Sequence, residues 1–218
     1  TGYSHYEKAE AVAREIEGLG RKAIALKLDV ADLDQVSDGV RKAEATLGPI
    51  DILVNNAAYG IIRATTLVNT DKKDWDRDLA VNLTGAFNTI KCVMPGMTER
   101  GWGRIINISS IAGTMGGMGQ CSYAATKAGL IGLTKAVALE GARKGVTCNA
   151  LVLGSIDGGA FNQVVPEFRE RITKRIAMRR LGNPQEVSNI LVFLASEESS
   201  YLTGEAIEVS GGASLFTF

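Results

Sequence analysis

The chain contains few of the residues that build metal centres, catalytic triads and disulfide frameworks. Its 218 residues include one histidine, His5, and three widely spaced cysteines, Cys92, Cys121 and Cys148. A single histidine argues against a multi-histidine metal site and against a Ser-His-Asp triad. Three isolated cysteines form neither a disulfide framework nor a zinc knuckle. We therefore expect reduced thiols, no metal and a cytoplasmic location.

Charge of one sign and long apolar runs are also missing. The 24 lysines and arginines balance 24 aspartates and glutamates. No apolar stretch approaches the roughly 20 residues that cross a bilayer, so we expect neither nucleic acid nor a membrane as a partner. Glycine is abundant, with 25 residues, which indicates many tight turns. The length fits a single domain over 1–218.

Short apolar runs alternate with longer amphipathic stretches. We expect strands at 23–28, 50–54, 104–108, 146–152 and 205–209, and helices at 6–19, 32–47, 70–100, 122–144, 166–178 and 184–195. Asp32 and Asn183 are the expected N-caps, and Pro95-Gly96 is expected to kink or end the long helix. The interior strands are apolar on both faces. This pattern predicts an α/β fold, a Rossmann-like doubly wound parallel sheet in a three-layer α/β/α arrangement.

Tyr123 and Lys127 lie four residues apart in the expected 122–144 helix, so that one turn places them on the same face. A nearby cation lowers the pKa of a phenol from about 10 toward neutrality, which suits general acid or base catalysis. Ser110 follows the 104–108 strand, where its hydroxyl can hydrogen-bond a substrate oxygen. The same spacing is also found where a buried phenol merely lies beside a solvated lysine.

Polar residues follow several of the expected strands. They are Asp29, Asn55, Asn56, Ser110 and Gly154. In a parallel sheet, ligands bind beyond the carboxyl ends of the strands. We therefore expect these residues to converge on one binding site.

Seven segments carry a resemblance to a known family. They are LDV at 28–30, DILVNNA at 51–57, VNLTG at 81–85, GRIINISS at 103–110, YAATKAG at 123–129, YLTG at 201–204 and VSGG at 209–212. In this order, with twelve residues between Ser110 and Tyr123, the chain resembles the classical short-chain dehydrogenase/reductases. Within that family it is most similar to the 3-oxoacyl-[acyl-carrier-protein] reductases.

The resemblance implies catalytic roles for four residues. Tyr123 would donate the proton in reduction and accept it in oxidation. Lys127 would hold the cofactor ribose and lower the phenol pKa, and Ser110 would orient the carbonyl oxygen. Asn82 would hold a water that relays protons to the lysine; the alternative is an asparagine packed inside a helix.

The resemblance also implies cofactor contacts, by Asp29 and Val30 with the adenine, Asn56 and Ala57 along the adenosine ribose, Ile156 with the nicotinamide carboxamide, and the loop that begins at Gly154. Asp29 can also cap the following helix. No acid occurs in Tyr3-Ser4-His5, where an acid would favour NAD, so we expect NADP, with NAD possible.

The chain departs from the family pattern at two places. It lacks the glycine-rich turn of the family, and we expect that turn and the first strand to be missing between Gly2 and Tyr3. A chain that truly lacks them would have no central strand and doubtful dinucleotide binding. After the sixth strand of the family, Leu153 replaces a proline and Gly158 replaces a threonine.

The sequence therefore predicts an NAD(P)-dependent oxidoreductase acting on a small carbonyl/alcohol pair, first of all a 3-oxoacyl thioester. The alternative within the family is a sugar, polyol or cyclic alcohol. The alternative of another class is a non-catalytic scaffold that has lost cofactor binding. The family's usual assembly implies a homotetramer, or a homodimer, built by the 70–100 and 122–144 helices and the last strand.

Overall fold

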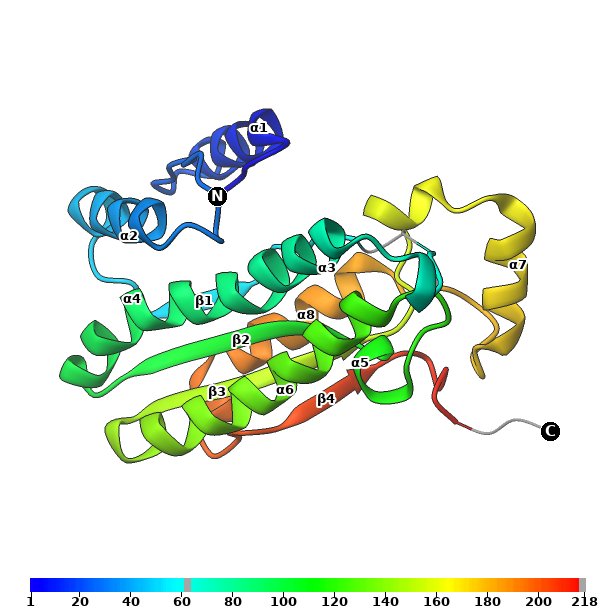
Figure 1. The fold of residues 1–218 in the computed structure, drawn as a ribbon. Helices are drawn as coiled ribbons and strands as arrows, with labels where there is room; N and C mark the ends of the chain where they lie inside the picture. Colours follow the sequence, from blue (N-terminus) through cyan, green and yellow to red (C-terminus); the bar gives the residue numbers. More distant parts are fainter. Residues whose placement is uncertain (61–63, 216–218) are drawn as a thin grey trace.

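The computed structural model describes residues 1–60 and 64–215. Its sheet has four parallel strands in the order β1-β2-β3-β4, namely β1 (Ile52–Asn55), β2 (Gly103–Ser110), β3 (Val146–Leu153) and β4 (Ala206–Val209). The helices are α1 (Tyr6–Gly18), α2 (Leu33–Leu47), α3 (Lys72–Leu79), α4 (Gly85–Arg100), α5 (Ala112–Met115), α6 (Cys121–Gly141), α7 (Pro166–Arg175) and α8 (Pro184–Leu194). Because the strands are parallel, their carboxyl ends share one edge (Figure 1).

The central strands are buried on both faces, which explains their continuous apolar sequence. Ile105 of β2 packs with Val93 of α4 and Val137 of α6 in one core cluster. Its neighbour Ile106 points the other way and packs with Val187 of α8. Figure 1 shows α4 and α6 in front of the strands and α8 behind them. The expected doubly wound, three-layer α/β/α fold is confirmed.

The expected 70–100 helix is interrupted by a π-helical turn, Ala80–Thr84, which separates α3 from α4. The predicted end of the helix at Pro95-Gly96 is wrong, because this proline lies inside α4 and the helix continues to Arg100. A kink at this proline stays a prediction. Met97 is fully buried in the core beyond the proline, and this packing holds the last turn in place. The break therefore falls on Asn82, and π turns of this kind often mark functional sites.

Both predicted helix caps are confirmed. The Asp32 side chain accepts hydrogen bonds from the backbone N–H groups of Asp34 and Gln35 at the start of α2. Asn183 and Glu186 form a capping box at the start of α8, with Pro184 in the first turn.

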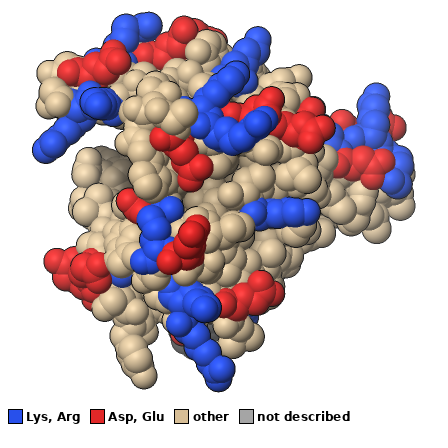
Figure 2. Space-filling model, turned by 90° about the vertical axis from the view of Figure 1, so that its left-hand side faces the viewer, with Lys and Arg blue, Asp and Glu red and all other residues tan. Residues whose placement is uncertain are grey.

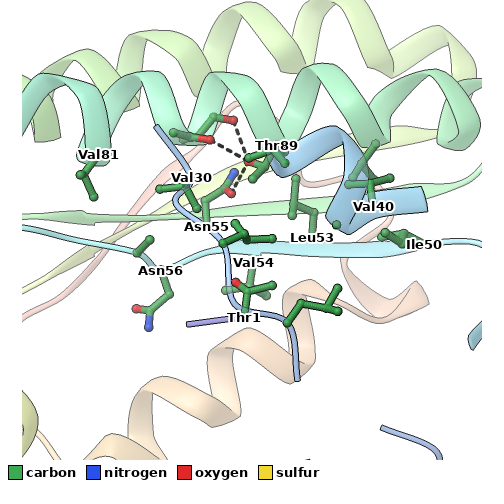
Figure 3. A pocket seen from close by; sticks show the side chains of 18 of the residues that line it. Thr1, Val30, Val40, Ile50, Leu53, Val54, Asn55, Asn56, Val81 and Thr89 are labelled. Atoms are coloured by element: carbon green, nitrogen blue, oxygen red, sulfur yellow. Dashed lines mark hydrogen bonds between the residues drawn. The ribbon is translucent and has the colours of Figure 1, made fainter. Parts of the chain in front are cut away.

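The predicted 23–28 strand is not a strand of the sheet. Among the described residues, its one ladder contact is the single parallel bridge between Gly2 and Lys27. An extended segment forms a ladder only beside a neighbouring strand, and within 1–60 and 64–215 none lies between 23–28 and β1. A cavity of about 460 Å³ lies there instead (Figure 3), lined mainly by apolar side chains such as Val30, Val40 and Leu53. This agrees with the expectation that the first strand is absent from the chain.

The surface carries charges of both signs. On the face shown in Figure 2, lysines and arginines lie next to aspartates and glutamates in several groups separated by uncharged surface. Within the described part of the chain, no helix combines the length and the apolar character that crossing a bilayer requires.

Gly113 allows α5 to pack directly on α6. A Cβ atom added there would lie 2.6 Å from the backbone carbonyl carbon of Lys127. Gly113→Ala must therefore push the two helices apart, and we expect it to lower the free energy of unfolding by about 1–3 kcal/mol in urea titrations. Gly132→Ala, in α6 with no atom within 4 Å of the added Cβ, is the control and should be neutral or stabilising by up to about 1 kcal/mol. Equal stability of the two variants would contradict this packing argument.

Candidate active site

Three of the predicted catalytic residues lie together where β2 meets α6. Ser110 is the last residue of β2, and Tyr123 and Lys127 lie in the first two turns of α6. The short helix α5 connects the two elements, and the backbone N–H of Ala112 donates to the Ser110 hydroxyl oxygen at 3.2 Å. Both Tyr123 and Lys127 are buried. The structure thus brings the serine, the phenol and the amine into one buried cluster.

The Ser110 hydroxyl is close enough to the Tyr123 phenol for hydrogen bonding to lower the phenol pKa. The Lys127 Nζ lies 5.6 Å from the centroid of the tyrosine ring. Burial raises the pKa of Tyr123 above its ordinary value of 10.0; the Ser110 hydrogen bond lowers it and the nearby Asp78 carboxylate raises it further. Burial, the largest cause, leaves the phenol pKa above its ordinary value in the protein alone, and the lowering by Lys127 stays a prediction. The phenol is therefore protonated at neutral pH, as a proton donor must be.

Lys127 is only 2% exposed. Its Nζ donates a hydrogen bond of 2.6 Å to the Ile108 carbonyl oxygen of β2. The Ser109 hydroxyl donates in turn to the Lys127 carbonyl oxygen at 2.8 Å, so two bonds join this helix position to the strand. Burial lowers the pKa of Lys127 from 10.5 to about 8, because desolvation disfavours the charged amine.

The Asn82 side chain joins the loop after β1 to α6. Its Oδ1 accepts from the Tyr59 N–H at 2.7 Å, and its Nδ2 donates to the Tyr59 carbonyl at 3.0 Å and to the Thr126 hydroxyl at 3.3 Å. This is the packed asparagine that the sequence left as an alternative. The water-holding role stays a prediction, and because the side chain is occupied, that role would fall to the main chain.

The predicted adenosine residues lie around two cavities, the first of which Asn82 also lines. Asn56 lines the cavity beside β1, where the neighbouring Asn55 turns toward Thr89 and accepts its hydroxyl at 2.6 Å (Figure 3). Asp29, Val30 and Ala57 line a second cavity of about 620 Å³. The structure therefore groups these four predicted cofactor residues around two cavities.

Arg77 is a residue of this region that the sequence did not indicate. Its Nη2 lies 2.8 Å from Oδ2 of Asp29. Its guanidinium carbon is 5.8 Å from the ring centroid of Tyr3 and 5.9 Å from that of Tyr59. Asp29, the predicted partner of the adenine amine, is thus already paired with a cation. Asp29 and Arg77 are 48 positions apart, so no local pattern reveals the pair.

Gly154 and Ile156 are held by the end of the sheet and line neither cavity. The Gly154 N–H donates to the Val209 carbonyl at 3.0 Å, and a Cβ atom at Gly154 would lie 2.8 Å from the Ser210 Cα. Ile156 forms a bridge with Gly182 and packs in the core cluster on the α8 face. Their contacts with a cofactor stay predictions.

Comparisons with known proteins agree with this geometry. A family model described as enoyl-(acyl carrier protein) reductase matches residues 2–214. The chain is 47% identical to the acetoacetyl-CoA reductase of Rhizobium meliloti over 188 residues. This match covers 85% of this chain and 77% of that protein. It superposes on a 3-oxoacyl-[acyl-carrier protein] reductase from Brucella melitensis with a TM-score of 0.88 and 35% identity, covering 95% of this chain and 78% of that one. A putative gluconate dehydrogenase from Agrobacterium tumefaciens gives a TM-score of 0.90 and 30% identity, covering 95% and 82%.

The lowered pKa of Lys127 makes a prediction about stability. Between about pH 8 and 10.5 the unfolded chain holds this proton and the folded chain has released it. The free energy of unfolding therefore rises with pH in this window, in total by up to about 3 kcal/mol. We expect Lys127→Met to lose this rise in urea titrations between pH 7 and about 9.5. Lys135→Met, at an exposed lysine of the same helix, is the control, and its free energy of unfolding should change with pH as in the unchanged protein. The same pH dependence in all three proteins would contradict the claim that burial lowers the Lys127 pKa.

Proposed function

We propose that this chain, which belongs to the short-chain dehydrogenase/reductase family, uses NADPH to reduce a 3-oxoacyl thioester to the 3-hydroxyacyl product. As a family member it is an NAD(P)-dependent oxidoreductase; the thioester and the choice of NADPH are the finer proposal. The observation that carries the proposal is the cluster in which the buried Tyr123 phenol lies under the Lys127 amine, next to Ser110 at the end of β2.

The reaction needs a hydride at the carbonyl carbon and a proton at the carbonyl oxygen. A bound dihydronicotinamide supplies the hydride. Tyr123 donates its phenolic proton to the oxygen, while the Ser110 hydroxyl donates a hydrogen bond that holds the oxygen and disperses its developing negative charge. Lys127, with a pKa lowered to about 8, can return a proton toward the phenol after each turnover. The carbonyl gains one hydride and one proton and becomes a secondary alcohol.

The residues around the second cavity fit the adenosine end of a nicotinamide cofactor. Asp29 is the acid among the described lining residues, and it is paired with Arg77. Lys8 also lines this cavity and is cationic. An unpaired acid repels a ribose 2′-phosphate; here the acid is neutralised and a lysine is at hand, which supports NADPH. The chain has no glycine-rich turn, so we assign no residue to the pyrophosphate.

The thioester is supported by what surrounds the cluster and by the relatives. Met115 at the end of α5 and Met118 before α6 are exposed in the segment that joins Ser110 to Tyr123, and apolar side chains there suit an acyl chain. Two of the similar proteins are named as reductases of acetoacetyl-CoA and of 3-oxoacyl-[acyl-carrier protein]. A sugar acid is the second candidate, favoured by the likeness to a putative gluconate dehydrogenase.

We further propose a cytoplasmic homotetramer or homodimer that uses the outer faces of α4 and α6. Phe87 of α4 and Leu139 of α6 are large apolar side chains left exposed by the single chain. Burying them against a second copy would remove apolar area from water.

Replacing Tyr123 with phenylalanine keeps the ring and removes the proton. We expect Tyr123→Phe to lower kcat for reduction by about 10²- to 10⁴-fold while the Kd for NADPH changes little. Tyr201→Phe, at a fully exposed tyrosine, makes the same chemical change and should keep full activity. Turnover by Tyr123→Phe close to that of Tyr201→Phe would rule out the assigned mechanism.

Cofactor and substrate preference are tested on the full-length protein with both reduced cofactors, using acetoacetyl-CoA and a keto sugar acid as substrates. We expect acetoacetyl-CoA and NADPH to give the highest kcat/KM. Lys8→Met should raise the KM for NADPH about tenfold, the worth of one charge-assisted hydrogen bond, and leave that for NADH unchanged. Lys42→Met, at an exposed lysine outside the cavity, is the control. Failure to bind either cofactor in a fluorescence titration would favour the scaffold alternative.

A further inference from the structure

Asp78 is a buried acid that the proposed reaction does not use. It lies near the end of α3 and is 1% exposed. Its Oδ2 accepts a hydrogen bond from the hydroxyl of Ser122, the residue that precedes Tyr123 in α6. A carboxylate is costly to bury unless other groups hold it. Its position beside the first turn of α6 therefore calls for an explanation.

The loop after β1 also packs against this carboxylate. Gly60 has a φ of +73°, and a Cβ atom there would lie 2.3 Å from Oδ1 of Asp78 and 2.9 Å from its Cγ. Only a residue without a side chain allows the backbone to approach the carboxylate so closely. Asp78 thus lies between the Gly60 loop and the helix turn that carries the proton donor.

The charged surroundings of Tyr123 are simple. Its own helix carries Lys127, whose amine bonds to the Ile108 carbonyl, and the thiol of Cys121, which faces Thr70. Two further charged residues of this helix, Lys135 and Glu140, are exposed two or more turns beyond Lys127. The elements α5 and Ala80–Thr84, both packed against α6, contain no charged residue. From α3, Arg77 is paired with Asp29, and Asp78 is the acid whose charge raises the phenol pKa.

We propose that Asp78 is a positioning residue for Tyr123: held between the Gly60 loop and the Ser122 hydroxyl, it fixes the first turn of α6 and places a carboxylate against the turn that carries the phenol. The inference rests on the proposed function, in which Tyr123 is the proton donor. A carboxylate here makes sense for an enzyme that reduces carbonyls, because a reductase needs a phenol that still carries its proton. An enzyme that only oxidises alcohols needs the phenolate, so a positive charge at this position would serve it better.

The test is the pH profile of the Asp78→Asn variant, which keeps the shape and the hydrogen-bonding capacity and removes the charge. Without the nearby anion the phenol loses its proton more easily, so its pKa falls. We expect the alkaline limb of kcat for acetoacetyl-CoA reduction to move down by about 0.5–1 pH unit. The acid limb of 3-hydroxybutyryl-CoA oxidation, which needs the phenolate, should move down by the same amount.

Two variants separate charge from structure. Ser122→Ala removes the hydrogen bond and keeps the carboxylate, so both limbs should stay in place even where kcat or stability falls. Asp51→Asn removes an exposed acid at the opposite end of β1 and controls for net charge. The proposal would be overturned if the pH limbs of Asp78→Asn lay within about 0.2 pH unit of those of the unchanged protein. It would also be overturned if the limbs of Ser122→Ala moved as far as those of Asp78→Asn.

If the Asp78→Asn protein does not fold, a second variant and a second measurement test the same proposal. The double variant Asp78→Val/Ser122→Ala removes the charge and leaves neither polar partner buried alone, and it should show the same downward shift. The phenol can also be titrated without turnover, from the ultraviolet absorbance of tyrosinate after subtracting the Tyr123→Phe spectrum. A protein with no reductase activity but a lowered phenol pKa in Asp78→Asn would defeat the proposed function and leave the role of Asp78 standing. A protein with normal reductase activity whose phenol pKa is unchanged in Asp78→Asn would support the proposed function and defeat the role of Asp78.

Discussion

The hydrogen bond from the Lys127 ammonium to the Ile108 carbonyl is the interaction on which the site depends. A cation cannot be buried without a partner, and this one is held by a carbonyl on the strand β2. The neighbouring Ser109 hydroxyl binds the backbone of the same lysine. These two bonds fix where α6 meets the end of β2. Once they are made, Ser110 follows on the strand and Tyr123 lies one helical turn before the lysine, so the cluster needs no further adjustment.

Burial acts on the two titratable groups of the cluster in opposite directions. It disfavours the charged form of each, so it raises the pKa of the Tyr123 phenol and lowers that of the Lys127 amine to about 8. The tyrosine therefore keeps its proton, while the lysine becomes able to give one up near neutral pH. A single physical cause thus creates both a proton donor and a group that can refill it. The Ser110 hydroxyl limits the effect on the phenol by stabilising the phenolate when it forms.

Features that follow from local sequence were predictable, and those that depend on distant residues were not. The Asp32 and Asn183 caps followed from residue type and position. The helix break did not, because Pro95 is a visible breaker while the π turn at Asn82 has no mark in the sequence. Asp78 lies in the polar stretch KKDWDRDL, which is typical of a solvated helix. Only the packing of Ser122 and the Gly60 loop against it makes that one acid a buried residue.

The loop after β1 and the first turns of α6 are joined by two parallel connections. In one, Asn82 binds the backbone of Tyr59 and the hydroxyl of Thr126, which in turn donates to the Tyr123 carbonyl at 2.7 Å. In the other, Asp78 lies between Gly60 and Ser122. The same loop carries Tyr59, against which Arg77 lies at the edge of the second cavity. The side of the site proposed for adenosine and the proton donor are therefore joined by a continuous set of side-chain contacts. Preorganisation of this kind lets a donor aim at a developing oxyanion without rearranging during the reaction.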